Sequence, residues 1–243
     1  MRNAIDQNLL NFKLIMNIQP AFDHFLFYTK NIEYDFKRCK EILKFPILYP
    51  VTNYGNFISA MFACKNSIIE LVYFENSIQN QQLTNLNFWI SGFALRSSNS
   101  IDSIRMDLQR TNLQMSDITI QNVKDKEGKS VPISKILLIN NSLPNLQVFF
   151  IEYLNNFLLK KYESISKESD WKISNFQINS ILTKEKDKQL IQLGFNSSDN
   201  LVYSDKKGIN FSFMKSDSNF PIINSFNIES INETIDLVKF FEN

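Results

Sequence analysis

The order of secondary-structure elements indicated by hydrophobic periodicity repeats along the chain, and this repeat narrows the fold more than any other feature. Each round consists of a strand, an amphipathic helix and three further strands. The first round takes residues 22–29, 34–43, 47–51, 57–64 and 67–74. The second round takes residues 89–97, 100–110, 117–123, 134–140 and 147–154. Two βαβββ rounds predict an α+β protein with mixed sheets, each curled around an inner face that leaves a half-open cleft.

A third, less regular round follows in the last part of the chain. Its strand, helix and two further strands take residues 172–182, 184–193, 201–204 and 209–215. Another strand is expected at 222–228. The sequence Ser230-Ile231-Asn232-Glu233 has the pattern of a capping box, which predicts the start of a last helix that runs to Phe241.

Three regions are expected from this organisation. Residues 1–20 form a polar lead, residues 21–158 a paired βαβββ domain, and residues 171–243 a third, partial module. The segment 160–170 is charged, rich in serine and without hydrophobic periodicity. It is therefore predicted to be the linker between the paired domain and the third module.

The balance of charge argues against a polyanionic partner. Lysine and arginine number 26 against 25 acidic residues, a formal charge of +1, so neither nucleic acid nor an anionic membrane would attract the chain over a long range. No apolar run approaches the roughly 18–20 residues that cross a bilayer, and the first residues lack a signal-peptide pattern. Cys39 and Cys64 have no metal-ligand spacing. We expect a cytoplasmic protein whose partner is a small molecule.

Three ionisable residues lie in strands that are otherwise apolar: His24, which is the only histidine, Glu70 and Glu152. Because side chains alternate along a strand, His24 is expected to share a face with Phe22, and Glu152 to lie opposite Tyr153. A buried carboxylate needs a cation, a metal, hydrogen bonds or protonation. Taken singly, each residue has an ordinary explanation, as a hydrogen-bonded core histidine or a glutamate at the mouth of a sheet. Together they make a donor set suited to a divalent metal.

The ordered motifs of the first two rounds resemble the glyoxalase-like domain proteins of the vicinal oxygen chelate superfamily. The motifs that carry the resemblance are Phe22-Asp23-His24-Phe25-Leu26-Phe27-Tyr28, Gly55-Asn56, Ile69-Glu70-Leu71-Val72, Trp89 with Phe93-Ala94-Leu95-Arg96-Ser97, and Phe149-Phe150-Ile151-Glu152-Tyr153. The likeness covers residues 21–155, and beyond residue 170 it is architectural only. It implies curled sheets around a small-molecule cleft.

In catalytic members of that superfamily, four residues on the first, fourth, fifth and eighth strands face the cleft and hold a divalent metal. The resemblance places His24, Glu70 and Glu152 on three of these strands, as ligands of Zn, Mn, Ni or Fe, and Glu70 or Glu152 as a catalytic base. The fifth-strand position falls on Gly92 or Ser91, and glycine has no donor atom in its side chain. Three protein ligands and a water can hold a catalytic ion. The missing donor equally suits a site without a metal.

Two functions therefore stay open. One is a metal-dependent lyase, isomerase or dioxygenase-type enzyme that stabilises an enolate or oxyanion. The other is a metal-free protein that sequesters a small apolar or aromatic molecule, which the 22 phenylalanines favour. Asn56, Trp89 and Arg96 are the expected ligand contacts, although Arg96 can instead neutralise Glu70 or Glu152. A homodimer, with the sheet serving mainly for dimerisation, is a third possibility.

Overall fold

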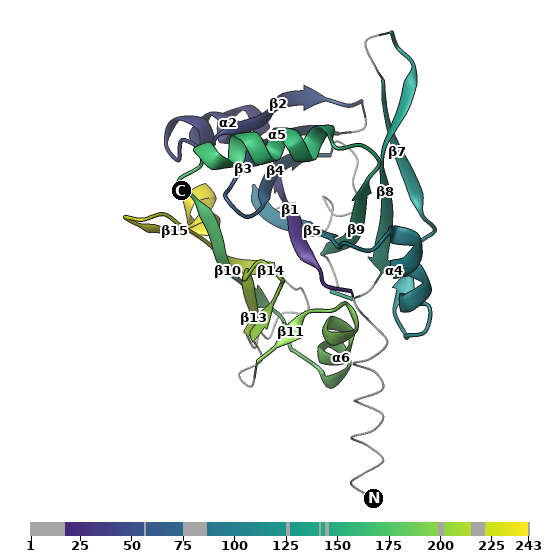
Figure 1. The fold of residues 1–243 in the computed structure, drawn as a ribbon. Helices are drawn as coiled ribbons and strands as arrows, with labels where there is room; N and C mark the ends of the chain where they lie inside the picture. Colours follow the sequence, from purple (N-terminus) through teal and green to yellow (C-terminus); the bar gives the residue numbers. More distant parts are fainter. Residues whose placement is uncertain are drawn as a thin grey trace, which may run out of the picture.

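The structure is a computed structural model, and it describes residues 18–55, 57–74, 87–124, 127–140, 142–143, 146–198, 202–214 and 222–242 (Figure 1). The first round comprises β1 (Ala21–Thr29), α2 (Ile32–Glu41), β2 (Ile47–Asn53), β3 (Ile58–Ala63) and β4 (Ile68–Tyr73). The second comprises β5 (Phe88–Arg96), α4 (Ile101–Leu108), β6 (Gln114–Met115), β7 (Thr119–Lys124), β8 (Ser130–Asn140) and β9 (Gln147–Tyr153). The expected βαβββ order is confirmed, with β6 and β7 in place of one strand.

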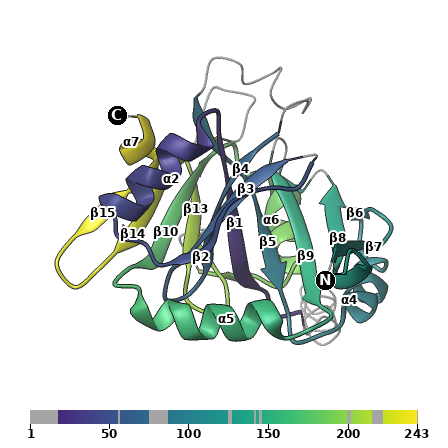
Figure 2. The same cartoon turned by 90° about the horizontal axis from the view of Figure 1, so that it is seen from above.

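Both rounds belong to one nine-stranded sheet, the first sheet, with the order β2-β3-β4-β1-β5-β9-β8-β6 and β7 paired to β8. The first strands of the two rounds, β1 and β5, pair antiparallel at its centre. On their other sides they pair in parallel with β4 and β9, the last strands of their own rounds. The sheet curls into a half-barrel, as the α+β expectation requires (Figure 2). One chain thus supplies both halves of the half-barrel.

The third round forms a second sheet beside the first. It comprises β10 (Lys172–Asn179), α6 (Lys184–Gln192), β11 (Asn196–Ser197), β12 (Val202–Ser204) and β13 (Asn210–Met214), followed by β14 (Ile222–Glu229), β15 (Thr234–Asp236) and α7 (Leu237–Glu242). The strand order is β11-β12-β13-β10-β14-β15. β10 lies between the parallel β13 and the antiparallel β14, as β1 lies between β4 and β5. The third round therefore repeats the topology of the first.

The segment between the two sheets is helical, which the sequence did not predict. The expected linker at 160–170 falls largely within α5 (Phe157–Ile165) and a 3-10 turn (Ser166–Glu168). The hydroxyl of Tyr162 donates to the backbone oxygen of Cys64 at 2.9 Å, which fastens α5 to the first sheet. The division of the chain into domains stays a prediction.

The expected capping box at Ser230 does not open a helix. The Ser230 hydroxyl accepts hydrogen bonds from the backbone N–H groups of Asn232 and Glu233, within the turn between β14 and β15. The last helix, α7, begins only at Leu237, after the short strand β15. None of the described helices is long and apolar enough to span a membrane.

A core rich in phenylalanine lies between the two sheets. Phe22, Phe25 and Phe27 of β1 are completely buried in it. The ring of Phe25 lies 5.4 Å from that of Phe176 in β10 and 4.8 Å from that of Phe226 in β14. Helices α2, α4 and α6 add side chains to the same core. The first sheet therefore has an outer face, which packs on the second sheet, and an inner face, which carries the candidate site.

Candidate ligand-binding site

A β-bulge in β1 brings Asp23 and His24 to the inner face of the first sheet. Phe22 pairs with Leu95 and His24 with Ala94, so Asp23 is an extra residue in the strand. A bulge interrupts the alternation of side chains. Phe22 therefore points into the core between the sheets, and the expectation that it shares a face with His24 is wrong.

Asp23, His24 and Glu70 form a continuous buried network. Nδ1 of His24 lies 3.1 Å from Oδ2 of Asp23, and Nε2 of His24 lies 3.5 Å from Oε2 of Glu70. Ser59 of β3 donates its hydroxyl to Oε1 of Glu70 at 2.6 Å. Each of the three ionisable residues is no more than 6% exposed. The imidazole is thus held between two carboxylates, which come from β1 and from its parallel neighbour β4.

Burial and neighbouring charges act in opposite directions on this network. Burial lowers the pKa of His24, but the hydrogen bond to Asp23 and the charges of Glu70 and Asp23 outweigh it and raise that pKa above its ordinary value. Burial raises the pKa of Asp23, but the hydrogen bond and charge of His24 and the charge of Arg96 outweigh it and lower that pKa. Burial prevails at Glu70 and raises its pKa. The geometry favours an imidazolium against an ionised Asp23, with Glu70 the carboxylate that more readily holds a proton.

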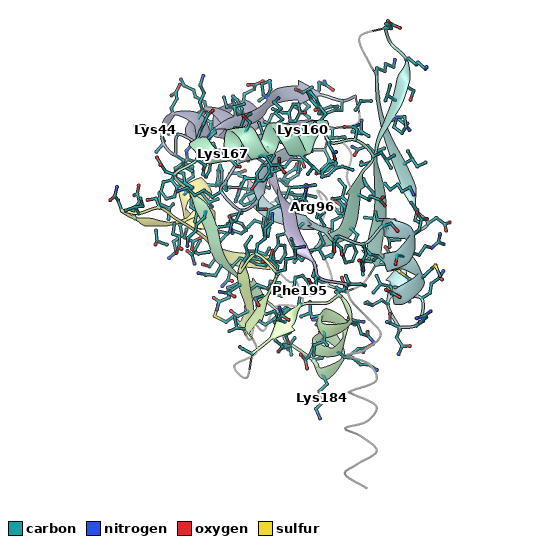
Figure 3. All side chains as sticks on the ribbon, viewed as in Figure 1. Lys44, Arg96, Lys160, Lys167, Lys184 and Phe195 are labelled. Atoms are coloured by element: carbon teal, nitrogen blue, oxygen red, sulfur yellow. The ribbon has the colours of Figure 1, made fainter. Side chains whose placement is uncertain are left out.

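Two residues of the second round hold Asp23. Nε of Arg96 lies 3.5 Å from Oδ1 of Asp23, and the hydroxyl of Tyr153 donates to Oδ2 at 2.6 Å. Arg96 lies beside β1 in the middle of the molecule (Figure 3). Arg96 was expected to neutralise a glutamate or to contact a ligand, whereas its partner here is Asp23. Asp23 was not among the expected site residues, although an aspartate next to the only histidine in an apolar strand is a usable signal.

Glu152 does not join this network, because its side chain is on the other face of β9. Its Oε2 accepts a hydrogen bond from the backbone N–H of Ile101, at the start of α4, at 2.8 Å. The first N–H groups of a helix lack partners within the helix, and a carboxylate is favoured at that end. Tyr153, one residue further along, reaches the inner face instead. The structure therefore brings together two of the three expected residues, His24 and Glu70.

Beyond the network, the inner face is apolar and aromatic. Its buried residues are Leu26, Tyr28, Val72, Trp89, Ala94, Phe149 and Ile151. The rings of Tyr28 and Trp89 stack with their centroids 3.7 Å apart. Trp89 is 5% exposed, and its Nε1 has no hydrogen-bond partner among the described residues. Trp89 therefore presents a buried, unused hydrogen-bond donor.

Gly92 and Ser91, the expected fifth-strand positions, supply no free donor to this face, whereas Asn56 lies outside the described residues. A Cβ atom added to Gly92 would lie 2.1 Å from the backbone oxygen of Gln147, so the backbone of β9 fills the space where a side chain would stand. The hydroxyl of Ser91 donates to the backbone oxygen of Leu26 at 3.3 Å.

A cavity of about 400 Å³ lies elsewhere in the molecule, at the start of α2. Its lining comes from the ends of β1 and β5 and from α2 and α7: Thr29, Lys30, Asn31, Tyr34, Asp35, Arg38, Asn87, Phe88, Phe241 and Glu242. None of the inner-face residues described above lines it. The cavity and the buried ionisable network are therefore separate features.

Comparison with known proteins identifies the fold by structure and not by sequence. No protein-family model and no curated protein matches the sequence. A hypothetical protein from Staphylococcus aureus matches over 88% of this chain and 92% of its own, with a TM-score of 0.67 and 14% identity. A mutant of 4-hydroxymandelate synthase from Streptomyces coelicolor, a vicinal oxygen chelate enzyme, matches over 82% of this chain and 64% of its own, with a TM-score of 0.55 and 8% identity. A methylmalonyl-CoA epimerase from Mycobacterium tuberculosis covers 61% of this chain and 99% of its own, with a TM-score of 0.45 and 12% identity.

The chain has the vicinal oxygen chelate fold. The resemblance expected from the motifs is confirmed at this level. Identities of 8% and 14% establish a common architecture and leave the activity to the site itself.

Strand register locates the two positions of the second half that match His24 and Glu70, which makes a set of four. The bulge residue Asp23 precedes His24 in β1, as the bulge residue Ser91 precedes Gly92 in β5, so Gly92 matches His24. Glu70 pairs with Leu26, the second residue after His24, and Phe149 pairs with Ala94, the second residue after Gly92. The second half therefore carries glycine and phenylalanine where the first half carries histidine and glutamate.

These residues do not fit a divalent metal. Only two of the four positions have donor atoms, and those atoms already have partners within the network. In the part of the chain that the structure describes, no group of three or more His, Cys, Asp or Glu residues is arranged to hold a metal ion. The expected ligand set of His24, Glu70 and Glu152 does not converge, because Glu152 faces α4.

Proposed function

We propose that the chain binds a small aromatic or apolar molecule on the inner face of its first sheet, without a metal. The pair Gly92 and Phe149 is the observation that carries the proposal. They stand at the positions of the second half that match His24 and Glu70, and neither side chain can coordinate an ion. Phe149 adds apolar surface to the inner face, and burying such surface contributes about 25 cal/mol per Å² to the binding of an apolar ligand.

Trp89 supports the proposal, because its N–H, which has no partner among the described residues, requires a hydrogen-bond acceptor on the ligand. An unpaired buried donor costs about 1–3 kcal/mol, which a ligand with a well-placed acceptor oxygen or nitrogen recovers. The indole also stacks on Tyr28, so a planar ligand meets an aromatic surface already held in place. The ligand that fits is a small planar molecule with one hydrogen-bond acceptor.

The network of Asp23, His24 and Glu70 makes one end of the inner face polar, but it does not require the ligand to be charged. The positive charges of His24 and Arg96 lie against the carboxylates of Asp23 and Glu70. Because these charges are matched within the protein, a ligand with a net charge would be left without a partner. We therefore expect the ligand to be neutral.

A panel of neutral aromatic compounds, in pairs with and without a carbonyl acceptor, tests the proposal. Carbonyl-bearing members should raise the melting temperature, and Trp89→Phe, which keeps a ring but removes the N–H, should weaken their binding about tenfold. Members without the acceptor should bind both proteins equally. Trp171→Phe is the matched control, because its Nε1 donates to the backbone oxygen of Leu43 at 2.7 Å, outside the inner face. No thermal shift with any compound, or equal losses for both members of a pair, would contradict the proposal.

The second candidate function is a metal-dependent lyase, isomerase or dioxygenase-type enzyme. One observation favours it: Nε2 of His24 and Oε2 of Glu70 face each other on the inner face, as a nitrogen and an oxygen donor. Metal analysis of protein purified without chelators separates the two functions. Near-stoichiometric Zn, Mn, Ni or Fe that disappears in Glu70→Gln would support the enzyme. A metal-free protein whose melting temperature is unchanged by EDTA would support the binding protein.

Neither function needs a second copy of the chain, because β1 and β5 join both halves of the half-barrel within one chain. The homodimer stays a prediction, for which light scattering at micromolar concentration is the direct measurement.

A further inference from the structure

Two matched pairs of hydrogen bonds join the two sheets, and the first pair is between backbone atoms. The N–H of Lys65, in the turn between β3 and β4, donates to the oxygen of Trp171, just before β10, at 2.8 Å. The N–H of Lys206, in the equivalent turn between β12 and β13, donates to the oxygen of Pro20, just before β1, at 3.0 Å. Each sheet uses the same turn to contact the same point of the other sheet's first strand. The contact is two-fold in character, like the isologous interface of a dimer.

The second pair uses side chains and lies two residues further along each strand. Oδ1 of Asn66 accepts from the N–H of Ile173 at 2.9 Å, and Oδ2 of Asp205 accepts from the N–H of Phe22 at 2.8 Å. Phe22 and Ile173 each stand immediately before a bulge, since the register of β1 and of β10 shifts at the next residue. Each side chain therefore holds the other sheet at the point where its strand departs from regular pairing.

Asp205 has a separate role for each carboxylate oxygen. Oδ1 accepts from the N–H groups of Lys207 at 2.9 Å and Ile209 at 2.8 Å, and so shapes the turn between β12 and β13. Oδ2 is the atom that holds Phe22. Asp205 is 3% exposed. From the same turn, the ammonium group of Lys207 donates to the backbone oxygen of Asn66 at 2.8 Å, which fixes the turn against the first sheet.

The bulge in β1 is also held from within the first sheet. The hydroxyl of Ser67 donates to the backbone oxygen of Asp23 at 2.9 Å. The N–H of Phe22 donates to Asp205, and the backbone oxygen of Asp23 accepts from Ser67. These two bonds fix the backbone on both sides of the bulge. The carboxylate of Asp23 reaches Nδ1 of His24 from this backbone conformation.

We propose that Asp205 is a positioning residue for the site on the inner face. By holding the N–H of Phe22, it fixes the bulge that orients the carboxylate of Asp23 toward the imidazole of His24. The third round is then part of the site and not an independent unit. This role of Asp205 goes beyond the proposed function, because the geometry of the network does not depend on which ligand binds.

NMR of the imidazole tests this directly, because His24 is the only histidine and gives a single set of ring signals. In Asp205→Asn the amide oxygen can keep both bonds of the turn, while the amide nitrogen, a donor, replaces the oxygen that accepted from Phe22. At fixed pH, the ring signals of His24 should move by more than their width in this variant. The amide of Phe22 should lose protection from hydrogen exchange.

Asp236→Asn is the matched control. Oδ1 of Asp236 accepts from the N–H groups of Phe226 at 3.0 Å and Val238 at 3.1 Å, so this change alters a carboxylate with the same kind of bonds in the second sheet. Because both bonds end on one oxygen, which the amide can keep, this change should leave the His24 ring signals in place. Unmoved ring signals in Asp205→Asn, or equal movement in both variants, would overturn the proposal.

Native-state hydrogen exchange of the unaltered protein decides the question if Asp205→Asn does not fold. If Asp205 fixes the bulge, the backbone amides of Phe22 and His24 should exchange through one common opening, with the same dependence on low denaturant concentration. A Phe22 amide that opens while His24 stays protected would show that the clamp and the network are uncoupled. Loss of ligand binding has no part in either measurement, so failure here and failure of the proposed function are distinguishable.

Discussion

β1 of the first sheet and β10 of the second sheet have the same arrangement of neighbouring strands, but one face differs in chemistry and in burial: it is buried in β1 and partly exposed in β10. Each lies between a parallel neighbour and an antiparallel neighbour. Each has two shifts of register at matching places, after Phe22 and Leu26 in β1 and after Ile173 and Gln177 in β10. The bulges are therefore a property of the repeated architecture.

The residues beside those bulges differ in charge. Strand register matches Asp23 with Ser174, His24 with Asn175, Glu70 with Ser212 and Ala94 with Asn227. In the second sheet, the side-chain amide of Asn227 donates to Oδ1 of Asn175 at 2.9 Å. This hydrogen bond joins the residues that match His24 and Ala94, and neither of them carries a charge. The first sheet instead carries an imidazole between two carboxylates.

The comparison separates what the fold requires from what the site requires. Both sheets have the bulges and an apolar outer face, so these features belong to the architecture. Buried charges are costly unless they are matched, and the second sheet forms the same strand pairing with uncharged polar residues. We therefore assign the network of Asp23, His24 and Glu70 to function and not to folding.

The largest expected effect comes from the outer face that the two sheets share. Phe25→Ala and Phe176→Ala remove rings at matching positions, and both rings are almost completely buried in the common core. Each change should lower the free energy of unfolding by about 3–5 kcal/mol, measured by chemical denaturation. A much smaller cost for Phe176→Ala would mean that the second sheet unfolds separately and that the core is not shared.

Copying the second sheet's polar residues into the first should have the next largest effect. Asp23→Ser alone should cost about 3 kcal/mol, because it leaves the buried imidazole without its hydrogen-bonded partner. The triple variant D23S/H24N/E70S should cost less than this single change, since it removes the buried charges together and leaves only Arg96, whose side chain is 29% exposed, without its partner. Denaturation curves of both variants test the order. A triple variant less stable than Asp23→Ser would show that the fold needs the charges, and the comparison would fail.

The pH dependence of stability should also differ between the sheets, because Asn175 cannot titrate where His24 does. The pKa of His24 is raised in the folded protein above the unfolded value of about 6.5. Its contribution is therefore complete below about pH 6.5 and is lost as the pH rises through the folded pKa. The wild-type free energy of unfolding should fall in this range by at most about 1.4 kcal/mol per pH unit, and His24→Asn should remove this fall. Denaturation at a series of pH values measures it, and an unchanged slope in His24→Asn would assign the dependence to another group.

Hydrophobic periodicity was sufficient to predict the order of strands and helices and to single out two residues of the candidate site, His24 and Glu70. The structure pairs β1 with β4, the first and last strands of the first round, in parallel. This pairing is what brings His24 and Glu70 together. Both residues could be predicted because each stands out as polar within an apolar strand.

The rest depended on features that periodicity does not record. A bulge adds one residue to a strand without any mark in the sequence pattern, so the face of Phe22 was mispredicted and Asp23 was overlooked. The partners Arg96 and Tyr153 come from the other half of the sheet, and Asp205 from the third round. The contacts of Arg96 and Tyr153 follow from the pairing of strands within the first sheet, and that of Asp205 from the packing of the two sheets. No local pattern specifies either.

The smallest expected effect is that of Glu152→Gln, for which Tyr153→Phe is the control. Alternation correctly placed Glu152 opposite Tyr153, but both faces of β9 are apolar, so the pattern did not show which face is the inner one. Glu152→Gln keeps an acceptor for Ile101 and loses the charge at the start of α4. It should cost about 0.5 kcal/mol and leave the His24 ring signals unmoved. Tyr153→Phe removes the hydroxyl that donates to Asp23 and should move those signals. Ring signals that respond to Glu152→Gln and not to Tyr153→Phe would reverse the assignment of the two faces, and with it the reading of Ile151 as part of the binding surface.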